Sequence, residues 1–219
     1  MNSKESETGT SAQPAKGNLF IIAAPSGGGK TSLVSGLLSA DSRLVLSVSH
    51  TTRMPRRGEH DGVQYHFINQ LAFNALVDEG AFLEHATVFS NSYGTHAGTL
   101  QQQLERGLDV ILEIDWQGAA QVREKFPDCC SIFILPPSYE ILRQRLSRRA
   151  QDSEEVINHR MRNAQGEISH WAEFDFIVVN EDFDSALADL KNIMDCARLG
   201  RSHQQDQHAL LLAELLGNG

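Results

Sequence analysis

The sequence predicts an α/β protein in which helices cover both faces of a parallel sheet. Short apolar runs without polar alternation recur along the chain, as expected of strands that are buried on both faces. Helical patterns separate most of these runs, which is the order of elements that produces parallel strands. The stretch 50–107 breaks this rhythm with short, mixed segments, so the prediction includes an inserted α+β subdomain.

The core elements follow from apolar runs and helical periodicity. The predicted strands are Leu19–Ala23, Leu44–Ser49, Val110–Asp115, Ser131–Leu135 and Phe176–Val179. The predicted helices are Ser32–Ser39, Gly118–Lys125, Tyr139–Arg149, Glu154–His170 and Phe183–Leu199.

Turn and cap residues delimit the elements of the insertion. Its predicted strands are Tyr65–Ile68 and Phe82–Val88, and its predicted helices are Leu71–Glu79, capped by Asn69 or Gln70, and Thr95–Arg106. A glycine, Gly80 or Gly107, ends each helix.

The domain organisation follows from these elements. Residues 17–49 and 108–200 are predicted to form the core, with a helical lid at about 138–162 and the subdomain 50–107 inserted. The polar stretch 1–16 reads as a disordered extension. The tail 201–219 carries a short amphipathic helix, Ala209–Leu215, which suits packing or contact between subunits and leaves a homo-oligomer open.

Composition excludes several classes of protein. The net charge of −9, from 28 acidic and 19 basic residues, argues against a bulk nucleic-acid binder. The apolar runs are much shorter than the roughly 20 residues of a membrane span, so no membrane partner is expected. The three cysteines, Cys129, Cys130 and Cys196, have neither disulfide-framework nor zinc spacing. They are interpreted as buried, reduced thiols of a cytoplasmic protein.

A phosphate-binding loop follows the first strand. Gly29-Lys30-Thr31 completes the pattern G-x-x-x-x-G-K-[ST], with Ala24 at the position of the first glycine. Lys30 would place a charge on the β- and γ-phosphates, and the Thr31 hydroxyl would be a ligand of Mg²⁺. The pattern therefore predicts a P-loop NTPase core that binds ATP or GTP with Mg²⁺. The residues assigned to this nucleotide are Ala24, Pro25, Ser26, Gly27, Gly28, Gly29, Lys30, Thr31 and Ser32.

An arginine pair follows the second strand. Arg53 and Arg56 lie three residues apart, and Pro55 restricts the chain between them. The carboxyl ends of parallel strands lie at the binding crevice of such folds. Two guanidinium groups there suit a dianionic phosphate.

Several long motifs resemble the guanylate kinases, most closely the bacterial ones, from about Leu19 to Leu199. They are S-V-S-H-T-T-R-x-P-R-x-G-E from Ser47 to Glu59, Tyr65-His66-Phe67, Phe82-Leu83-Glu84-His85, Ser92-Tyr93-Gly94-Thr95 and Glu113-Ile114-Asp115-Trp116-Gln117-Gly118.

The resemblance implies a guanine pocket in the insertion. Ser49 matches a serine that binds the guanine edge, Thr95 a hydroxyl that faces the base, and Asp115 an aspartate near the base and the metal-bound water. Glu84 matches the carboxylate that accepts from guanine N1–H and N2–H₂. Adenine would present an acceptor there, and such a mismatch in a buried pocket discriminates by about 10⁴.

The resemblance also assigns the phosphate contacts. Arg53, Arg56, Tyr65 and Tyr93 match residues that hold the GMP phosphate, and Arg149 and Arg160 match lid arginines that close over ATP. In the family's G-R-G lid pattern, Arg148 and Ala150 replace the glycines, which leaves open whether Arg148 or Arg149 reaches the phosphates. Asn180 matches a region near the adenine. Glu113, assigned to the GMP site, stands where many members have an aspartate that holds Mg²⁺ through water.

The expected reaction is Mg²⁺-dependent phosphoryl transfer from ATP to GMP, and to dGMP, giving ADP and GDP. Lys30, Arg53, Arg149 and Arg160 are the expected catalytic residues. Because the acceptor phosphate oxygen is already ionised, no general base is needed. Two alternatives remain: another nucleoside monophosphate kinase, and a non-catalytic guanylate-kinase-like interaction module.

Overall fold

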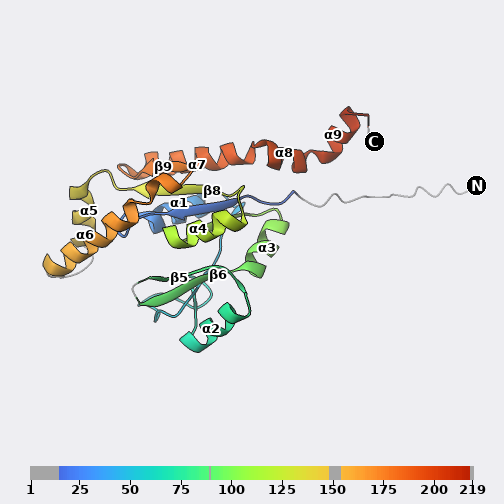
Figure 1. Ribbon diagram of the computed structural model, residues 1–219. Helices are drawn as coiled ribbons and strands as arrows, with labels where there is room; N and C mark the ends of the chain where they lie inside the picture. Colours follow the sequence, from blue (N-terminus) through green and yellow to red (C-terminus); the bar gives the residue numbers. More distant parts are fainter. Residues whose placement is uncertain (1–14, 89, 148–153, 218–219) are drawn as a thin grey trace, which may run out of the picture.

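Five parallel strands form the central sheet, in the order β2–β7–β1–β8–β9 (Figure 1). The computed structural model describes residues 15–88, 90–147 and 154–217. The strands are β1 Leu19–Ala23, β2 Leu44–Leu46, β7 Asp109–Glu113, β8 Cys130–Leu135 and β9 Phe176–Val179. Their carboxyl ends share one edge of the sheet, where the phosphate loop begins. The predicted α/β class with a helix-flanked parallel sheet is confirmed.

Apolar side chains pack on both faces of this sheet. Phe20 and Ile22 point into one hydrophobic cluster and Ile21 into the other, and all three are fully buried. The first cluster packs under α1 Lys30–Ala40 and α7 Phe183–Arg198, and the second under α3 Ala97–Glu105 and α4 Trp116–Lys125. Burial on both faces explains why the strands lack polar alternation.

A second sheet lies beside the core, in the order β4–β3–β6–β5. Its strands are β3 His50–Thr51, β4 His66–Phe67, β5 Phe82–Val88 and β6 Asn91–His96, and it carries the helix α2 Gln70–Asp78. Figure 1 shows it as a separate layer below the central sheet. Gln121 of α4 joins the two layers by donating to the carbonyl of His85 on β5 (2.8 Å).

Two helices project beyond the carboxyl edge of the central sheet. They are α5 Tyr139–Ser147 and α6 Glu154–Ile168, which share a small apolar core that includes Leu142, Leu146 and Met161. A 3₁₀ turn, Trp171–Glu173, follows α6 and leads into β9. The chain then continues through α7 into α8 Arg201–Gln207 and α9 Ala209–Leu215, the latter as predicted.

Several predicted boundaries are wrong. The second strand ends at Leu46 and not at Ser49, and the strand predicted at Tyr65–Ile68 spans only His66–Phe67. The helix predicted from Thr95 begins at Ala97. Thr95 belongs instead to β6, which has a polar sequence without a strand pattern and forms by pairing with β5 and β3.

Other expectations have mixed outcomes. Asn69, and not Gln70, caps α2 by accepting from the Ala72 N–H (2.8 Å). Cys129 is buried, Cys130 is half-buried and Cys196 is exposed, so the expectation of three buried thiols holds only for Cys129. The predictions for residues 1–14 and for the lid segment 148–153, including Arg149, lie outside the described residues.

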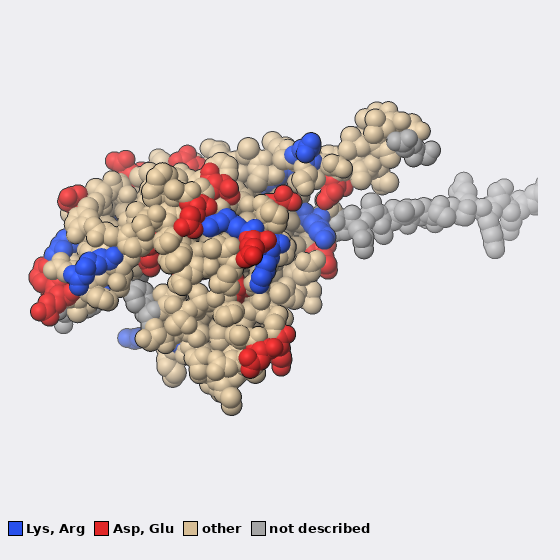
Figure 2. Space-filling view, in the orientation of Figure 1, with Lys and Arg blue, Asp and Glu red and all other residues tan. Residues whose placement is uncertain are grey.

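The surface carries both signs of charge. Figure 2 shows blue and red side chains next to one another over the core, while the lower part of the insertion presents mainly uncharged and acidic residues on this face. Within the described ranges, no helix is long and apolar enough to cross a membrane.

Candidate active site

A cavity of about 310 Å³ lies between the carboxyl edge of the central sheet and the inserted sheet. It brings together the phosphate loop, the ends of β7 and α6, and one face of β5 and β6. Its lining residues are Ala24, Pro25, Ser26, Gly27, Gly29, Lys30, Thr31, Ser32, Ser49, Tyr65, Glu84, Ala86, Val88, Tyr93, Glu113, Ile114, Asp115 and Glu167.

The phosphate loop connects β1 to α1 in the predicted manner. Gly27 and Gly29 have positive φ angles of 87° and 94°, a conformation that side chains disfavour. Gly29 caps α1 without a side-chain hydrogen bond, so the first N–H groups of the helix are available to an anion. Gly28 lies behind the loop and is absent from the cavity lining.

Lys30 and Thr31 begin α1 and face the end of β7. The Lys30 ammonium donates to the carbonyl of Ile114 (3.2 Å), and the Thr31 hydroxyl donates to Glu113 Oε1 (2.6 Å). Thr31 is thus the partner of Glu113, and the predicted hydroxyl and carboxylate are adjacent. This pair is a set of hard oxygen donors beside the loop, which is the chemistry that Mg²⁺ requires.

A second polar group lies on the insertion side of the cavity. The Thr95 hydroxyl donates to Glu84 Oε1 (2.6 Å) and lies 3.4 Å from the Ser49 hydroxyl. Glu84 is only 3% exposed. The predicted set Ser49, Glu84 and Thr95 therefore comes together, although β5, β6 and the segment before β3 contribute one residue each.

Burial determines the charge state of Glu84. The pKa of this carboxyl is raised to about 7, because burial and, to a smaller extent, the charge of Asp115 outweigh the opposing Thr95 hydrogen bond. Asp115 also lines the cavity and caps α4 by accepting from the Gly118 N–H (3.0 Å). The pocket therefore holds a carboxylate that is short of donors.

Arg53 and Arg56 of the insertion do not line the cavity, although the Arg53 guanidinium lies 5.4 Å from the ring centroid of Tyr65, which does. Arg53 makes a two-pronged ion pair with Glu59, with both N–O distances at 2.9 Å, and this pairing raises the pKa of Arg53. The Arg56 side chain is exposed, and its backbone N–H donates to Glu59 (2.7 Å). Tyr65 and Tyr93 do line the cavity, with ring centroids 5.9 Å apart.

Comparisons with known proteins identify this arrangement. The family model described as guanylate kinase matches residues 16–197. The guanylate kinase of Alkalilimnicola ehrlichii is 56% identical over 201 residues, which cover 92% of this chain and 99% of the relative. The chain belongs to the guanylate kinase family.

Two further guanylate kinases are similar to this chain, one in sequence and one in structure. The guanylate kinase of Coxiella burnetii is 52% identical over 201 residues, which cover 92% of this chain and 98% of the relative. The crystal structure of guanylate kinase from Anaplasma phagocytophilum matches with a TM-score of 0.74 at 31% identity, over 91% of this chain and 97% of that chain. The chain is thus an ATP:GMP phosphotransferase, and neither alternative is favoured.

Two residues assigned to ATP have supporting contacts in this kinase structure. Asn180 lies outside the cavity lining, and its side-chain amide donates to the Gly28 carbonyl (2.8 Å) from behind the loop. The Arg160 guanidinium donates to the carbonyl of Leu146, so it joins α6 to α5 (3.1 Å). Neither contact is with the cavity itself.

The sequence did not predict four residues that line this guanylate kinase cavity, namely Ala86, Val88, Ile114 and Glu167, nor Gly118, which packs against Glu84. Glu167 lines the cavity from α6, and nothing in the local sequence distinguishes it from the other polar residues of that helix. Gly118 packs against Glu84, because a Cβ atom there would meet Glu84 Oε2 at 2.6 Å. Its position in the motif Glu113–Gly118 was the available signal.

Proposed function

We propose that the cavity binds GMP through the Ser49, Glu84 and Thr95 set and ATP through the phosphate loop. The observation that carries this assignment is Glu84, a buried carboxylate in the cavity that accepts a hydrogen bond from the Thr95 hydroxyl. Guanine offers two adjacent N–H groups, which complete the hydrogen bonding of such a carboxylate. A buried acceptor left without donors costs free energy, so guanine is favoured over bases that lack this pair.

The domain assignment supports this proposal. We assign residues 17–49 and 108–200 to the ATP-binding core and 50–107 to the GMP-binding subdomain, with the lid at about 138–162. Because the proposed contacts reach the base and the phosphate, dGMP is an expected substrate as well. We also assign the enzyme to the cytoplasm, and a homo-oligomer stays a prediction.

The metal assignment rests on the Thr31 and Glu113 pair. In the part of the chain that the structure describes, no group of three His, Cys, Asp or Glu side chains is suited to a metal. Mg²⁺ commonly takes one or two protein oxygens and completes its shell with water and phosphates, so the pair fits it. Thr31 would bind the ion through its hydroxyl oxygen. Glu113 would either accept the hydrogen bond of that hydroxyl or contact the ion through a water molecule. Bound Mg²⁺ would neutralise charge on the phosphates.

The chain's own residues act mainly by positioning. Lys30 reaches the phosphates from the start of α1, and Tyr65 and Tyr93 border the GMP phosphate. Arg53, Arg149 and Arg160 would contact the transferred phosphoryl group once the insertion and the lid close. Arg53 would then have to leave its ion pair with Glu59 and bind phosphate instead. Closure would exclude water that could otherwise hydrolyse ATP.

Replacing Glu84 by Gln tests the base assignment. The amide adds a donor where guanine also presents donors, so we expect KM for GMP to rise by at least about 100-fold. KM for ATP should change less than about twofold, as measured by a coupled assay with each substrate varied. Equal increases in both KM values would contradict the assignment. Lys30→Ala provides the comparison on the ATP side, with a loss of about 10²–10³ in kcat.

A further inference from the structure

Glu167 lines the nucleotide cavity, yet it has no part in the reaction described above. It is the penultimate residue of α6, whose first part lies in the proposed lid. Its Oε2 atom accepts a hydrogen bond from the backbone N–H of Ser26 (2.8 Å), which is 141 residues away in the sequence. This contact joins α6 directly to the phosphate loop.

The position is electrostatically unfavourable for a carboxylate. Burial and the charge of Asp115 raise the pKa of Glu167 above its usual value, although the Ser26 N–H and the charge of Lys30 oppose this shift. A negative charge at this place repels the phosphates that the loop binds. An uncharged side chain could fill the same space without this repulsion. The presence of a carboxylate therefore indicates that its hydrogen bond to the Ser26 N–H has a role.

The contact leaves the main phosphate donors of the loop available. Ser26 precedes the glycines, and the Gly28 N–H donates to the Pro25 carbonyl (2.8 Å), which makes Pro25–Gly28 a tight turn. Glu167 binds the N–H inside this turn. The first N–H groups of α1, which have no intrahelical acceptor, therefore remain available to an anion.

A second contact holds the same end of α6. The ring of His170, two residues after the helix, stacks on Trp116 with centroids 3.5 Å apart and planes 6° apart. Trp116 is the first residue of α4, whose cap, Asp115, lines the cavity. Arg160 precedes Glu167 by seven residues, so both lie on the same face of α6. The carboxyl end of α6 is thus attached to two elements of the site.

We propose that Glu167 is a positioning residue that sets the phosphate loop relative to α6, so that the loop and Arg160 hold one triphosphate together. The inference rests on the proposed binding of ATP at the loop. Glu167 acts through the Ser26 N–H and does not touch the reacting atoms. Its loss would impair the binding and transfer of ATP and leave the GMP pocket intact.

The test compares Glu167→Gln with Glu167→Leu. Glutamine keeps an acceptor for the Ser26 N–H, so we expect KM for ATP to stay within about threefold of the wild type. Leucine removes the acceptor, and we expect KM for ATP to rise at least about tenfold, with kcat reduced and KM for GMP within about twofold. Glu155→Leu, an exposed glutamate of the same helix, is the matched control and should leave both KM values unchanged.

Three outcomes would overturn the inference: an unchanged KM for ATP in Glu167→Leu, equal impairment of Glu167→Gln and Glu167→Leu, or a parallel rise of KM for ATP and GMP. Thermal unfolding of each variant, without and with ADP, checks that it folds and reports ADP binding independently of turnover. Lys30→Ala separates this inference from the proposed function. If Lys30→Ala behaves like the wild type, ATP binding at the loop is itself wrong. If Lys30→Ala is impaired and Glu167→Leu is not, only the role of Glu167 fails.

Discussion

At the scale of single residues, the site depends on a carboxylate in an environment that disfavours its charge. Glu84 lies between the Thr95 hydroxyl and the backbone of α4, with the Lys125 ammonium bound to the neighbouring Leu83 carbonyl. The charge of Lys125 lowers the Glu84 pKa, but burial has the larger effect and raises it. In the proposed complex, guanine would supply two hydrogen-bond donors to this carboxylate.

The raised pKa of Glu84 predicts a pH-dependent affinity for GMP. With a pKa of about 7, the ionised fraction in the nucleotide-free protein rises about tenfold between pH 6 and pH 8. Only the ionised form accepts from both guanine donors, so KM for GMP should fall over this range. Glu84→Gln should lose that dependence while keeping the titration of the GMP phosphate, whose second pKa is near 6. Parallel pH profiles for the two proteins would contradict the assignment.

The same pKa shift has a consequence for stability. Because the pKa of Glu84 is raised above its unfolded value of 4.5, its contribution favours folding below about pH 4.5 and is lost as the pH rises through about 7. The nucleotide-free protein therefore carries an unfavourable contribution from this residue at pH 8. If GMP binds Glu84 as proposed, its donors would offset that contribution.

Gly118 leaves room for the Glu84 carboxylate because it has no Cβ atom. A Cβ atom at this helical position would lie 2.6 Å from Glu84 Oε2 and 3.1 Å from its carboxyl carbon. Gly118→Ala should displace the carboxylate and raise KM for GMP about 10- to 100-fold, with KM for ATP unchanged. Gly166→Ala, also within a helix but with nothing within 4 Å of the added carbon, is the control. If both variants have wild-type kinetics for GMP, the close packing against Glu84 is not required.

At the scale of elements, the inserted sheet contains a group of rings packed around His50. His50 of β3 lies against His66 of β4 and His96 of β6, with centroids 4.7 and 6.1 Å away, and against the edge of Phe82. The Nδ1 atom of His50 is buried without a hydrogen-bond partner. The sheet therefore packs around an imidazole that is held neutral.

This packing predicts acid sensitivity of the insertion. The pKa of His50 is lowered to about 4, chiefly by burial and also by the neighbouring His66 and His96, while Asp61 opposes the shift. His50 therefore contributes stability that is present above its unfolded pKa of 6.5 and is lost as the pH falls through about 4. His50→Phe should lose less stability between pH 7 and pH 5 than the wild type in denaturant titrations. His60→Asn, at an exposed position, should follow the wild type, and a His50→Phe curve that also does so would refute the prediction.

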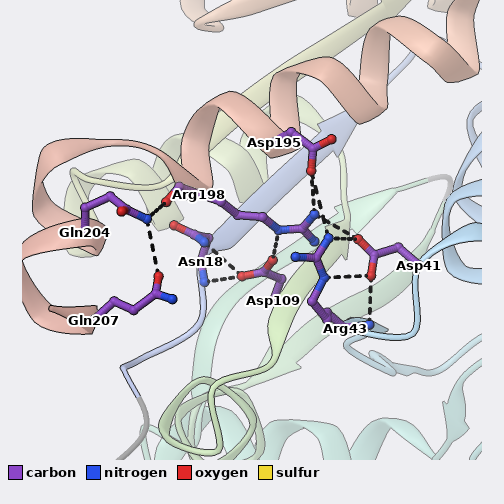
Figure 3. A network of polar contacts seen from close by, with 8 residues as sticks. All are labelled: Asn18, Asp41, Arg43, Asp109, Asp195, Arg198, Gln204 and Gln207. Carbon is purple, nitrogen blue, oxygen red and sulfur yellow. Dashed lines mark hydrogen bonds and ion pairs between the residues drawn. The ribbon is translucent and has the colours of Figure 1, made fainter.

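At the scale of the whole molecule, an ion-pair network joins both ends of the described chain at the sheet edge opposite the site (Figure 3). Arg198, at the end of α7, donates to Asp109 at the start of β7 (2.7 Å) and pairs with Asp41 and Asp195 (2.8 Å each). Asp109 also accepts from the backbone N–H of Asn18, just before β1 (2.7 Å). The network fastens α7 to the beginnings of the two central strands.

Breaking this network should destabilise the fold without changing the chemistry. The side chains of Arg198 and Asp109 are 11% and 6% exposed, so Arg198→Ala leaves a buried carboxylate without its cation, at a cost of about 3 kcal/mol in unfolding free energy. Arg43→Ala removes an arginine that is 63% exposed and should cost less than about 1 kcal/mol. Urea denaturation measures both, and kcat of the folded proteins should match the wild type. Equal losses for the two variants would refute a special role of Arg198.

The sequence by itself determined the class of fold, the phosphate loop and the family. These features depend on contiguous residues: apolar runs define strands, and the glycines with Lys30 and Thr31 define a loop whose backbone geometry is local. The set Ser49, Glu84 and Thr95 could be predicted because the family resemblance assigned it, since nothing local marks Glu84 as buried.

The tertiary structure alone decided what depends on segments meeting across the fold. Polar β6 became a strand only because β3 and β5 supply its hydrogen bonds, which is why a helix starting at Thr95 was a wrong prediction. The burial of Glu84, the Glu59 partner of Arg53 and the contact between Glu167 and Ser26 likewise have no signal in local sequence. Solvent exclusion and pairing between distant residues set the pKa of a group and the direction in which it points, and both arise only when the chain has folded.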